Sequence, residues 1–398
     1  MKKTLVTLLL LAVVSLLGMG IIVVASASVT QGPTPYYYFQ RQLKWVGAAI
    51  LVGLLFSRFD YHLWKKYLVW EKYPLFSVGF YLLFAFLLVL TLCPGIAVEH
   101  KGSFRWLYLG GKQIFQPGEF AKLAIIVAVA VWLDHVGRRV HQFRRGVAVP
   151  AVIIGVYAVL LFLEKDLGAM MVVCLMGGAL MFVAGTRIWQ LAALAGCGIL
   201  SIGGAVLTLF LVSPQSLEQM KENRLGRIWA WLEGSGSTAD ASYQIKQAIL
   251  AIKSGGLWGV GFNQSLQKYW FLPEAHTDCI FAIGAEELGL CFSLGMLVAY
   301  AVLLVCGILI AIHAQDRLGR LLAFGMTLLL VFQAAFNIGV ITGLLPPKGM
   351  ALPFMSYGGS NLLTAMFAVG TLFNILLHMD VYDERMHTVV VRDAADTV

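Results

Sequence analysis

The chain has 398 residues, of which 59% are hydrophobic and 13% are charged, and its formal net charge is +8. About a quarter of the residues in a soluble globular protein are charged. The composition therefore excludes an ordinary soluble enzyme, and it also excludes a disordered chain. It predicts an all-α polytopic membrane protein, with residues 1–398 forming one transmembrane domain. The positive charge comes with no nucleic-acid motif and is typical of cytoplasmic loops.

About ten apolar segments are long enough to be transmembrane helices. They are residues 4–27, 43–57, 74–93, 118–134, 147–163, 167–185, 190–212, 285–312, 321–343 and 361–378. The first resembles a signal peptide, with Lys2 and Lys3 before the apolar run and Ala-Ser-Ala at its end. Its apolar stretch is longer than that of a usual signal peptide, so we interpret it as a span.

Basic residues indicate the orientation of these spans. The pairs Lys65–Lys66, Arg138–Arg139 and Arg144–Arg145 lie in alternate connections. Such clusters mark the cytoplasmic side, so both termini are predicted to be cytoplasmic, with a short tail over about 379–398. A large extracytoplasmic loop, about 213–278, then joins the seventh and eighth helices. Its second half is apolar and glycine-rich, which is typical of a segment at the membrane interface.

Charged residues within apolar segments are costly and are often functional. Glu119 and Lys122 open the fourth segment, where their spacing allows an ion pair on one helix face. This pair is either structural or part of a cavity that binds a charged substrate. Pro117 is well placed at the start of that helix.

Two further acidic groups have equally open interpretations. Glu164, Lys165 and Asp166 form a short turn, which is either solvated or part of the site. Glu286 and Glu287 stand near the start of the eighth segment, where one of them can face a cavity or stabilise the helix N-terminus.

Asp278 is the strongest candidate for a catalytic residue. It ends the long loop beside an apolar stretch, close in sequence to His276. Partial loss of water there favours the protonated form and brings a carboxylate into the range of a general base. The alternative is an ordinary helix N-cap.

The last loop, GLLPPKGMALPFMSYGGSNLL, predicts a rigid non-helical path, because proline and glycine punctuate it. Irregular backbone at this depth requires protein or a watery cavity around it. Ser356 can donate a hydrogen bond there. Several basic residues are expected on the same side and are either scattered or gathered around a pyrophosphate: Arg105, Arg224, Arg227, Lys246 and Lys348.

Four stretches of sequence resemble the SEDS family, the shape, elongation, division and sporulation proteins of bacteria. They are FRWLYLGGKQIFQPGEFAKL, YQIKQAILAIKSGGLWGVGF, LPEAHTDCIFAIGAEELG and LPPKGMALPFMSYGGSNLL. The segment PPKGMALP is similar to the FtsW and SpoVE type within that family. The chain departs from the usual pattern at Cys279, at the start of GAEELG (Gly284 and Ala285) and at Asn361, and none of these changes removes a charged position.

The resemblance implies a peptidoglycan glycosyltransferase with ten helices that polymerises lipid II on the outer face of the cytoplasmic (inner) membrane, at the division septum. It places the family's essential aspartate on Asp278, its Glu/Lys pair on Glu119 and Lys122, and a further aspartate on Asp166. It also implies a class B penicillin-binding protein and other divisome proteins as partners. The sequence identifies no cofactor with certainty. A divalent cation, Mg²⁺ or Mn²⁺, could neutralise the charge of the pyrophosphate.

The resemblance and the charges described above together give the substrate-binding residues that we expect around Asp278. They are Glu119, Lys122, Arg105, Asp166, Arg227, Lys246, His276, Glu286, Lys348 and Ser356. Two other functions remain open: a lipid II flippase, or a divisome scaffold without catalysis. Charge gathers on the outer side rather than at the bilayer midplane, which favours the enzyme.

Overall fold

The computed structural model is mostly helical. It describes residues 1–29, 34–68, 74–93, 97, 104–109, 112–212, 239–272, 275–346 and 349–379. The first half contains α1 (Lys2–Ala27), α2 (Tyr37–Arg58), α3 (His62–Leu68), α4 (Pro74–Thr91), β1 (Leu107–Leu109), β2 (Lys112–Phe115), α5 (Pro117–Val136), the 3-10 turn η1 (Gly137–His141), the π-helical turn η2 (Phe143–Ala148) and α6 (Val149–Leu163). The second half contains α7 (Leu167–Val183), α8 (Ile188–Val212), α11 (Ala239–Gly255), α12 (Gln267–Trp270), α13 (Ile280–His313), α14 (Arg317–Ile341) and α15 (Gly359–His378).

The helices are long and apolar, as the sequence predicts for a polytopic membrane protein. Six in the described part of the chain have the length and composition to cross a membrane, or seven if the bent pair α2 and α3 is one span. Three shorter apolar helices lie at Val78–Thr91, Leu167–Val183 and Ile188–Gly198. Each apolar segment expected from the sequence coincides with a helix, so the polytopic character is confirmed.

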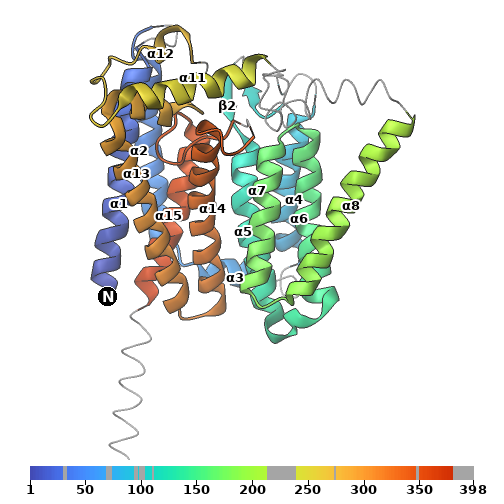
Figure 1. Ribbon diagram of the computed structural model, residues 1–398. Helices are drawn as coiled ribbons and strands as arrows, with labels where there is room; N and C mark the ends of the chain where they lie inside the picture. The colour runs from blue at the N-terminus through green and yellow to red at the C-terminus, as the bar shows by residue number, and fades with distance from the viewer. Residues whose placement is uncertain are drawn as a thin grey trace, which may run out of the picture.

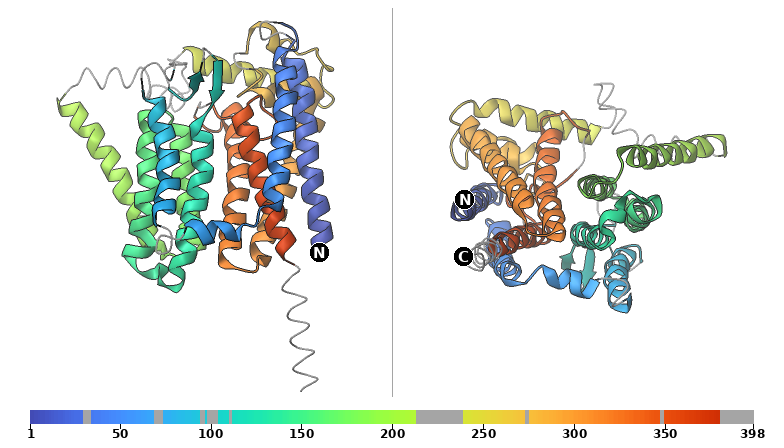
Figure 2. Two further views of the ribbon diagram at one scale, coloured as in Figure 1. Left: turned by 180° about the vertical axis from the view of Figure 1, so that it is seen from behind. Right: turned by 90° about the horizontal axis from the view of Figure 1, so that it is seen from below.

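The helices form two groups that stand side by side (Figure 1). One contains α1, α2, α13, α14 and α15, and the other contains α4, α5, α6 and α7, with α8 leaning away from it (Figures 1 and 2). The helix α5 joins the groups, since it packs against α7 and α14. Small residues permit close approach within a group: a Cβ on Gly370 of α15 would lie 2.5 Å from the carbonyl oxygen of Gly53 in α2. Such contacts are typical of helices that associate in lipid.

The first helix is an integral part of the bundle. It packs along α13, and Ser26, near its end, donates a 2.6 Å hydrogen bond to the buried carboxylate of Glu287. These contacts support a membrane span rather than a signal peptide.

One end of the bundle carries the connecting elements β1, β2, α11 and α12 (Figure 1). We call it the loop end, and we call the opposite end, where Lys2 lies, the N-terminal end. The antiparallel hairpin of β1 and β2 is a departure from the all-α expectation, in which this stretch was only a connection. The helix α11 was also not expected: it lies across the loop end (Figure 1) and packs on α13 and α14. Residues 213–238 of the predicted large loop lie outside the described residues.

Candidate functional site

Asp278 lies at the loop end, in the turn that leads into α13, and its side chain is partly exposed. Its backbone is fixed by Asn337 of α14, whose side-chain nitrogen donates to the carbonyls of Asp278 at 2.9 Å and Met350 at 2.5 Å. A Cβ at position 349 would lie 2.2 Å from Oδ2 of Asp278, so glycine leaves room for the carboxylate. The cap of α13 is Cys279, without a side-chain hydrogen bond, and the N-cap interpretation of Asp278 is therefore wrong.

The segment from Gly349 to Gly358 holds the turn that contains Asp278. The Ser356 hydroxyl donates to the carbonyl of Thr277 at 2.6 Å and accepts from the amide of Leu352 at 2.8 Å. The amide of Tyr357 donates to the carbonyl of His276 at 2.9 Å. The described part of the proline- and glycine-rich loop is non-helical up to Gly358, as predicted, and its last residues, from Gly359, begin α15. Ser356 is buried and fully engaged with backbone groups, so its contact with substrate stays a prediction while its contact with the Asp278 turn is direct.

An aromatic group from α2 completes this side of the site. The His276 ring stacks on Tyr38 with centroids 4.1 Å apart, and Tyr357 meets Tyr38 edge-on at 4.8 Å. The Gln42 side chain donates to the carbonyl of Ser356 at 3.3 Å. Burial raises the pKa of Tyr357, so its hydroxyl stays a hydrogen-bond donor at neutral pH.

The sequence analysis missed Asn337, Tyr38 and Gln42. The available signal was polarity within an apolar setting: Asn337 interrupts the 321–343 segment, and Gln42 immediately precedes the 43–57 segment. A polar side chain at such a position needs a partner, and here the partner is the backbone that carries Asp278 or Ser356.

Glu119 and Lys122 form the predicted ion pair, with Nζ and Oε1 2.8 Å apart on one face of α5. Both are buried, and Glu119 Oε2 has no hydrogen-bond partner among the described residues. Pro117 begins the helix, as expected. The preceding amide, of Gln116, donates to Ser360 Oγ of α15 at 3.2 Å, so the helix that carries the ion pair starts beside the end of the Gly349–Gly358 segment.

The turn between α6 and α7 is not a solvated turn, because Glu164 and Asp166 are only 1% and 5% exposed. Asp166 accepts from the amide of Ala169 at 3.1 Å and caps α7, and Arg105 Nε lies 3.3 Å from its other oxygen. Glu164 accepts from the Thr91 hydroxyl at 2.6 Å. Burial raises the pKa of Glu164 to about 8, with Asp166 adding to this effect and Thr91 and Arg105 opposing it.

Glu286 and Glu287 both bind the loop between α11 and α12. Glu286 accepts from the Ser265 hydroxyl at 2.5 Å and from the amide of Leu266 at 3.1 Å. The amides of Val260 and Gly261 donate to the carbonyls of the two glutamates. Both glutamates therefore have partners in this loop, and the prediction that one of them faces a substrate cavity is not tested by these contacts. These contacts show that Glu286 stabilises the loop between α11 and α12. Its contact with substrate stays a prediction.

Lys268 forms an ion pair with Glu287. Its ammonium is buried and donates to Glu287 at 2.8 Å, Ser26 at 2.7 Å and Asn263 at 2.6 Å. The loop can reach the glutamates because α13 is broken at Gly289, where φ is 71°. A Cβ on Gly259 would lie 2.1 Å from the carbonyl oxygen of Glu287, so the approach of loop and helix also depends on glycine.

The remaining candidates are dispersed. Lys246 is exposed on α11, two residues from Gln244, whose amide donates to Cys279 Sγ at 3.1 Å. Arg227 and Lys348 lie outside the described residues. Of the predicted site residues, His276 and Ser356 thus lie at the turn that contains Asp278, and Arg105 forms an ion pair with Asp166.

Comparisons with known proteins agree with this architecture. The model of a family described as "Cell cycle protein", which is named for FtsW, RodA and SpoVE, matches residues 7–380. The chain belongs to this family. A relative from Geobacter sp. (strain M18), named "Probable peptidoglycan glycosyltransferase FtsW", is 35% identical over 94% of this chain and 96% of its own length. "Stage V sporulation protein E" of Bacillus subtilis (strain 168) is 37% identical over 94% and 98% of the two chains.

Solved structures show the same fold. One, from work described as "Structural coordination of polymerization and crosslinking by a peptidoglycan synthase complex", covers 93% of this chain and 97% of its own, with a TM-score of 0.72 and 25% identity. The rod shape determining protein RodA of Thermus thermophilus is 26% identical over 94% and 96% of the two chains, with a TM-score of 0.63. The chain is therefore a multi-pass membrane protein of this family.

Proposed function

We propose that this chain is a peptidoglycan glycosyltransferase that polymerises lipid II into glycan strands during septal cell-wall synthesis. The observation that carries the proposal is the setting of Asp278: a partly exposed carboxylate on a turn that Asn337, Ser356 and Tyr357 hold from two other elements. A general base needs this combination of fixed position and access to substrate. The name of the Geobacter relative supports the same activity.

In the proposed reaction, Asp278 accepts the proton of the GlcNAc 4-hydroxyl of the acceptor lipid II. The oxygen then forms a bond to the anomeric carbon of the donor MurNAc, with inversion, while the bond from that carbon to the pyrophosphate oxygen breaks. Undecaprenyl pyrophosphate leaves with both electrons of the broken bond. A good leaving group needs no general acid, so a single carboxylate is sufficient, in contrast to the pair that glycosidases use.

The charge of the leaving pyrophosphate needs cationic partners. Lys122 pairs with Glu119, and Arg105 pairs with Asp166. Each of these two cations would therefore contact the pyrophosphate while it remains paired with its carboxylate. Lys246 is exposed on α11 and is available for this role. Arg227 and Lys348 complete the proposed set on the basis of sequence alone.

A divalent cation, Mg²⁺ or Mn²⁺, is proposed only as a companion of the pyrophosphate. Such ions prefer several oxygen ligands. In the described part of the chain, the one cluster of three ligating side chains lies elsewhere, at Asp60, His62 and His378. The residues described around Asp278 therefore do not fit a resident ion, and no step of the proposed reaction depends on one.

We further propose ten membrane spans with both termini cytoplasmic, which places the loop end outside the inner membrane at the division septum. Counting the bent pair once, the seven long spans and the three shorter apolar helices support this topology. A class B penicillin-binding protein is the proposed partner, alongside other divisome proteins. The similar solved complex, which coordinates polymerization and crosslinking, supports that partnership.

The test is polymerisation of lipid II by the purified full-length protein together with its partner. Glycan strands that require Asp278 would support the enzyme. Lipid II translocation across liposomes without any polymer would support the flippase instead. Normal septal recruitment and growth with Asp278→Asn would support a scaffold.

A further inference from the structure

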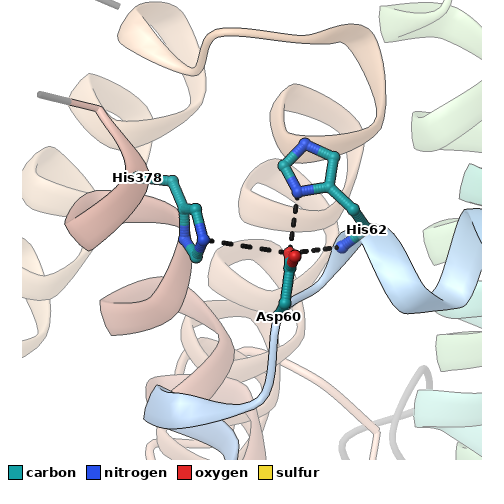
Figure 3. A group of neighbouring side chains, drawn as sticks. All are labelled: Asp60, His62 and His378. Carbon is teal, nitrogen blue, oxygen red and sulfur yellow. Dashed lines mark hydrogen bonds and ion pairs between the residues drawn. The ribbon is translucent and has the colours of Figure 1, made fainter. Parts of the chain in front are cut away.

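Three potential metal ligands meet at the N-terminal end of the bundle (Figure 3). Asp60 and His62 flank the bend between α2 and α3, and His378 ends α15. One ligating atom of each lies within 4.8 Å of the other two. The α15 helix has 20 residues and is therefore about 30 Å long, so this cluster is remote from Asp278, which lies near the other end of that helix.

The hydrogen bonds of His378 leave one ring nitrogen for a ligand. Its Nδ1 lies 2.8 Å from the carbonyl oxygen of Asn374. A carbonyl oxygen only accepts, so Nδ1 donates, and in the neutral imidazole Nε2 then has its lone pair available. Nε2 faces Asp60 Oδ1 at 3.9 Å (Figure 3), which is too far for a hydrogen bond. A side-chain rotation would bring both atoms to about 2 Å from one metal ion.

His62 reaches the cluster through its Nδ1, which donates a hydrogen bond to Asp60, so a metal ion would replace the Nδ1 proton and leave the ring proton on Nε2. Its Nδ1 lies 2.7 Å from Asp60 Oδ1, and its Nε2 faces Asp316 Oδ2 at 3.9 Å. A metal-bound histidine usually directs its second nitrogen to a carboxylate or a carbonyl, which fixes the ring and raises its basicity. The carbonyl of Asn374 is already such a partner for His378, and Asp316 becomes one for His62 once a ring movement shortens the 3.9 Å separation.

The ligands also rest on a rigid support. The Asn374 side chain donates to the carbonyl of Ser57 at 2.9 Å and accepts from the amide of Tyr61 at 3.1 Å. The buried Tyr61 donates its hydroxyl to Asp316 Oδ1 at 2.6 Å. The α2–α3 bend, α14 and α15 are thus joined directly around the cluster, which is what a preorganised metal site needs.

We propose that Asp60, His62 and His378 form a binding site for a transition-metal dication of the zinc type. Two imidazole nitrogens and one carboxylate are suited to Zn²⁺ and its neighbours, whereas Mg²⁺ and Ca²⁺ prefer oxygen-only sets. All three side chains are only partly buried, so water can supply the fourth ligand. The ion ties the bend after α2 to the end of α15. This proposal is independent of the proposed glycosyltransferase activity.

The experiment uses the full-length protein in detergent, purified with a histidine-free tag, treated with EDTA and desalted. Zn²⁺ binding is measured by calorimetry and the stoichiometry by elemental analysis. We expect one Zn²⁺ per chain, and a loss of affinity of at least about 10-fold in His62→Ala, His378→Ala or Asp60→Asn. Asp316→Asn should cost about 10-fold, the lower end of the effect of an outer partner.

His313→Ala is the matched control. His313 is also at the end of a helix, and its Nδ1 contacts the carbonyl of Leu309 at 2.9 Å, as His378 contacts Asn374. It should bind Zn²⁺ like the wild type. Melting temperatures without metal check the fold of every variant, and Zn²⁺ should raise the melting temperature of the wild type but not of the ligand variants. Undiminished affinity in a folded His62→Ala/His378→Ala double variant, or an equal loss in His313→Ala, would overturn the proposal.

Discussion

Two acidic groups lie on either side of the start of α13, and they differ in exposure and in their hydrogen bonds. Asp278 precedes the helix and is partly exposed, and the hydrogen bonds that fix it reach the backbone of its turn. Glu286 and Glu287 follow within the helix, are at most 2% exposed, and bond through their carboxylates to Ser265 and Lys268.

The two groups differ in exposure, because Asp278 is partly exposed and both glutamates are buried. A carboxylate whose own oxygens are engaged by buried donors stabilises the fold but has little capacity left for a substrate. A carboxylate whose backbone is held while its side chain reaches water can accept a proton from a bound molecule. The comparison predicts loss of activity without loss of stability at Asp278, and the reverse at the glutamates.

The largest expected effect is that of Asp278→Asn on polymerisation. The amide is nearly isosteric and cannot act as a base, so we expect the rate of glycan synthesis to fall by about 10²- to 10⁴-fold. The melting temperature should stay within a few degrees of the wild type. Gel analysis of the lipid II product together with a thermal melt gives both values.

Glu287→Gln is the matched control for this experiment. It removes the same charge from a buried carboxylate that accepts hydrogen bonds from Ser26 and Lys268. It should lower the melting temperature and leave the rate per folded molecule within a few-fold of the wild type. The comparison fails if Asp278→Asn polymerises lipid II at the wild-type rate.

The next effect in size concerns Lys268. Lys268→Met leaves the Glu287 carboxylate buried beside Ser26 without its cation. Breaking a buried ion pair typically costs about 3–5 kcal/mol of unfolding free energy. We expect a large drop in melting temperature, measured in detergent.

Two further variants test whether the loss of stability comes from the broken ion pair or from the replacement of a lysine as such. Lys268→Met/Glu287→Gln removes both charges and should recover part of the lost stability. Lys253→Met changes an exposed lysine of α11 and should have almost no effect. Equal losses in the single and double variants would show that the charge of Glu287 is not the cause.

Glu164 tests the comparison from a third position, since it is buried and its carboxylate accepts a hydrogen bond from the Thr91 hydroxyl at 2.6 Å. Burial raises its pKa from the ordinary 4.5 to about 8. The folded state then keeps the proton that the unfolded chain loses, so stability is fully present below about pH 4.5. It is lost as the pH rises toward 8, by on the order of 4 kcal/mol.

Glu164→Gln keeps the hydrogen-bond acceptor and removes the titration. Its melting temperature should exceed that of the wild type at pH 8 and match it near pH 5. A pH series of thermal melts measures the difference. Identical pH profiles for the two proteins would mean that Glu164 is ionised in the folded state.

The sequence predicted the membrane-spanning segments well, because a long apolar run has few other stable structures. It did not predict α11 or the β1–β2 hairpin. The α11 helix presents Ala248 and Ala251 to the bundle, a pattern of small residues that carries little hydrophobic signal. The hairpin strands have only three and four residues, which is too short for a clear alternation.

The candidate site was predictable only in part. Adjacent motifs placed His276 with Asp278, and helical spacing placed Glu119 with Lys122. The contacts of Asn337 with Asp278 and of Lys268 with Glu287 join residues from different elements. No local pattern encodes such pairings, because they depend on how helices pack.

The smallest predicted effect concerns Ser356, which acts on Asp278 through the backbone. Ser356→Ala removes the bridge between the amide of Leu352 and the carbonyl of Thr277. We expect a loss of about 1–3 kcal/mol in stability and a roughly 10-fold fall in kcat, because the base is held less firmly. KM for lipid II should hardly change, since Ser356 is buried beneath the turn. Ser254→Ala removes a hydroxyl of α11 that, among the described residues, bonds only to its own helix, at Ala251, and should leave both values unaltered. A rise in KM with unchanged kcat would instead make Ser356 a substrate contact, and the distinction between held backbone and engaged side chain would no longer describe this site.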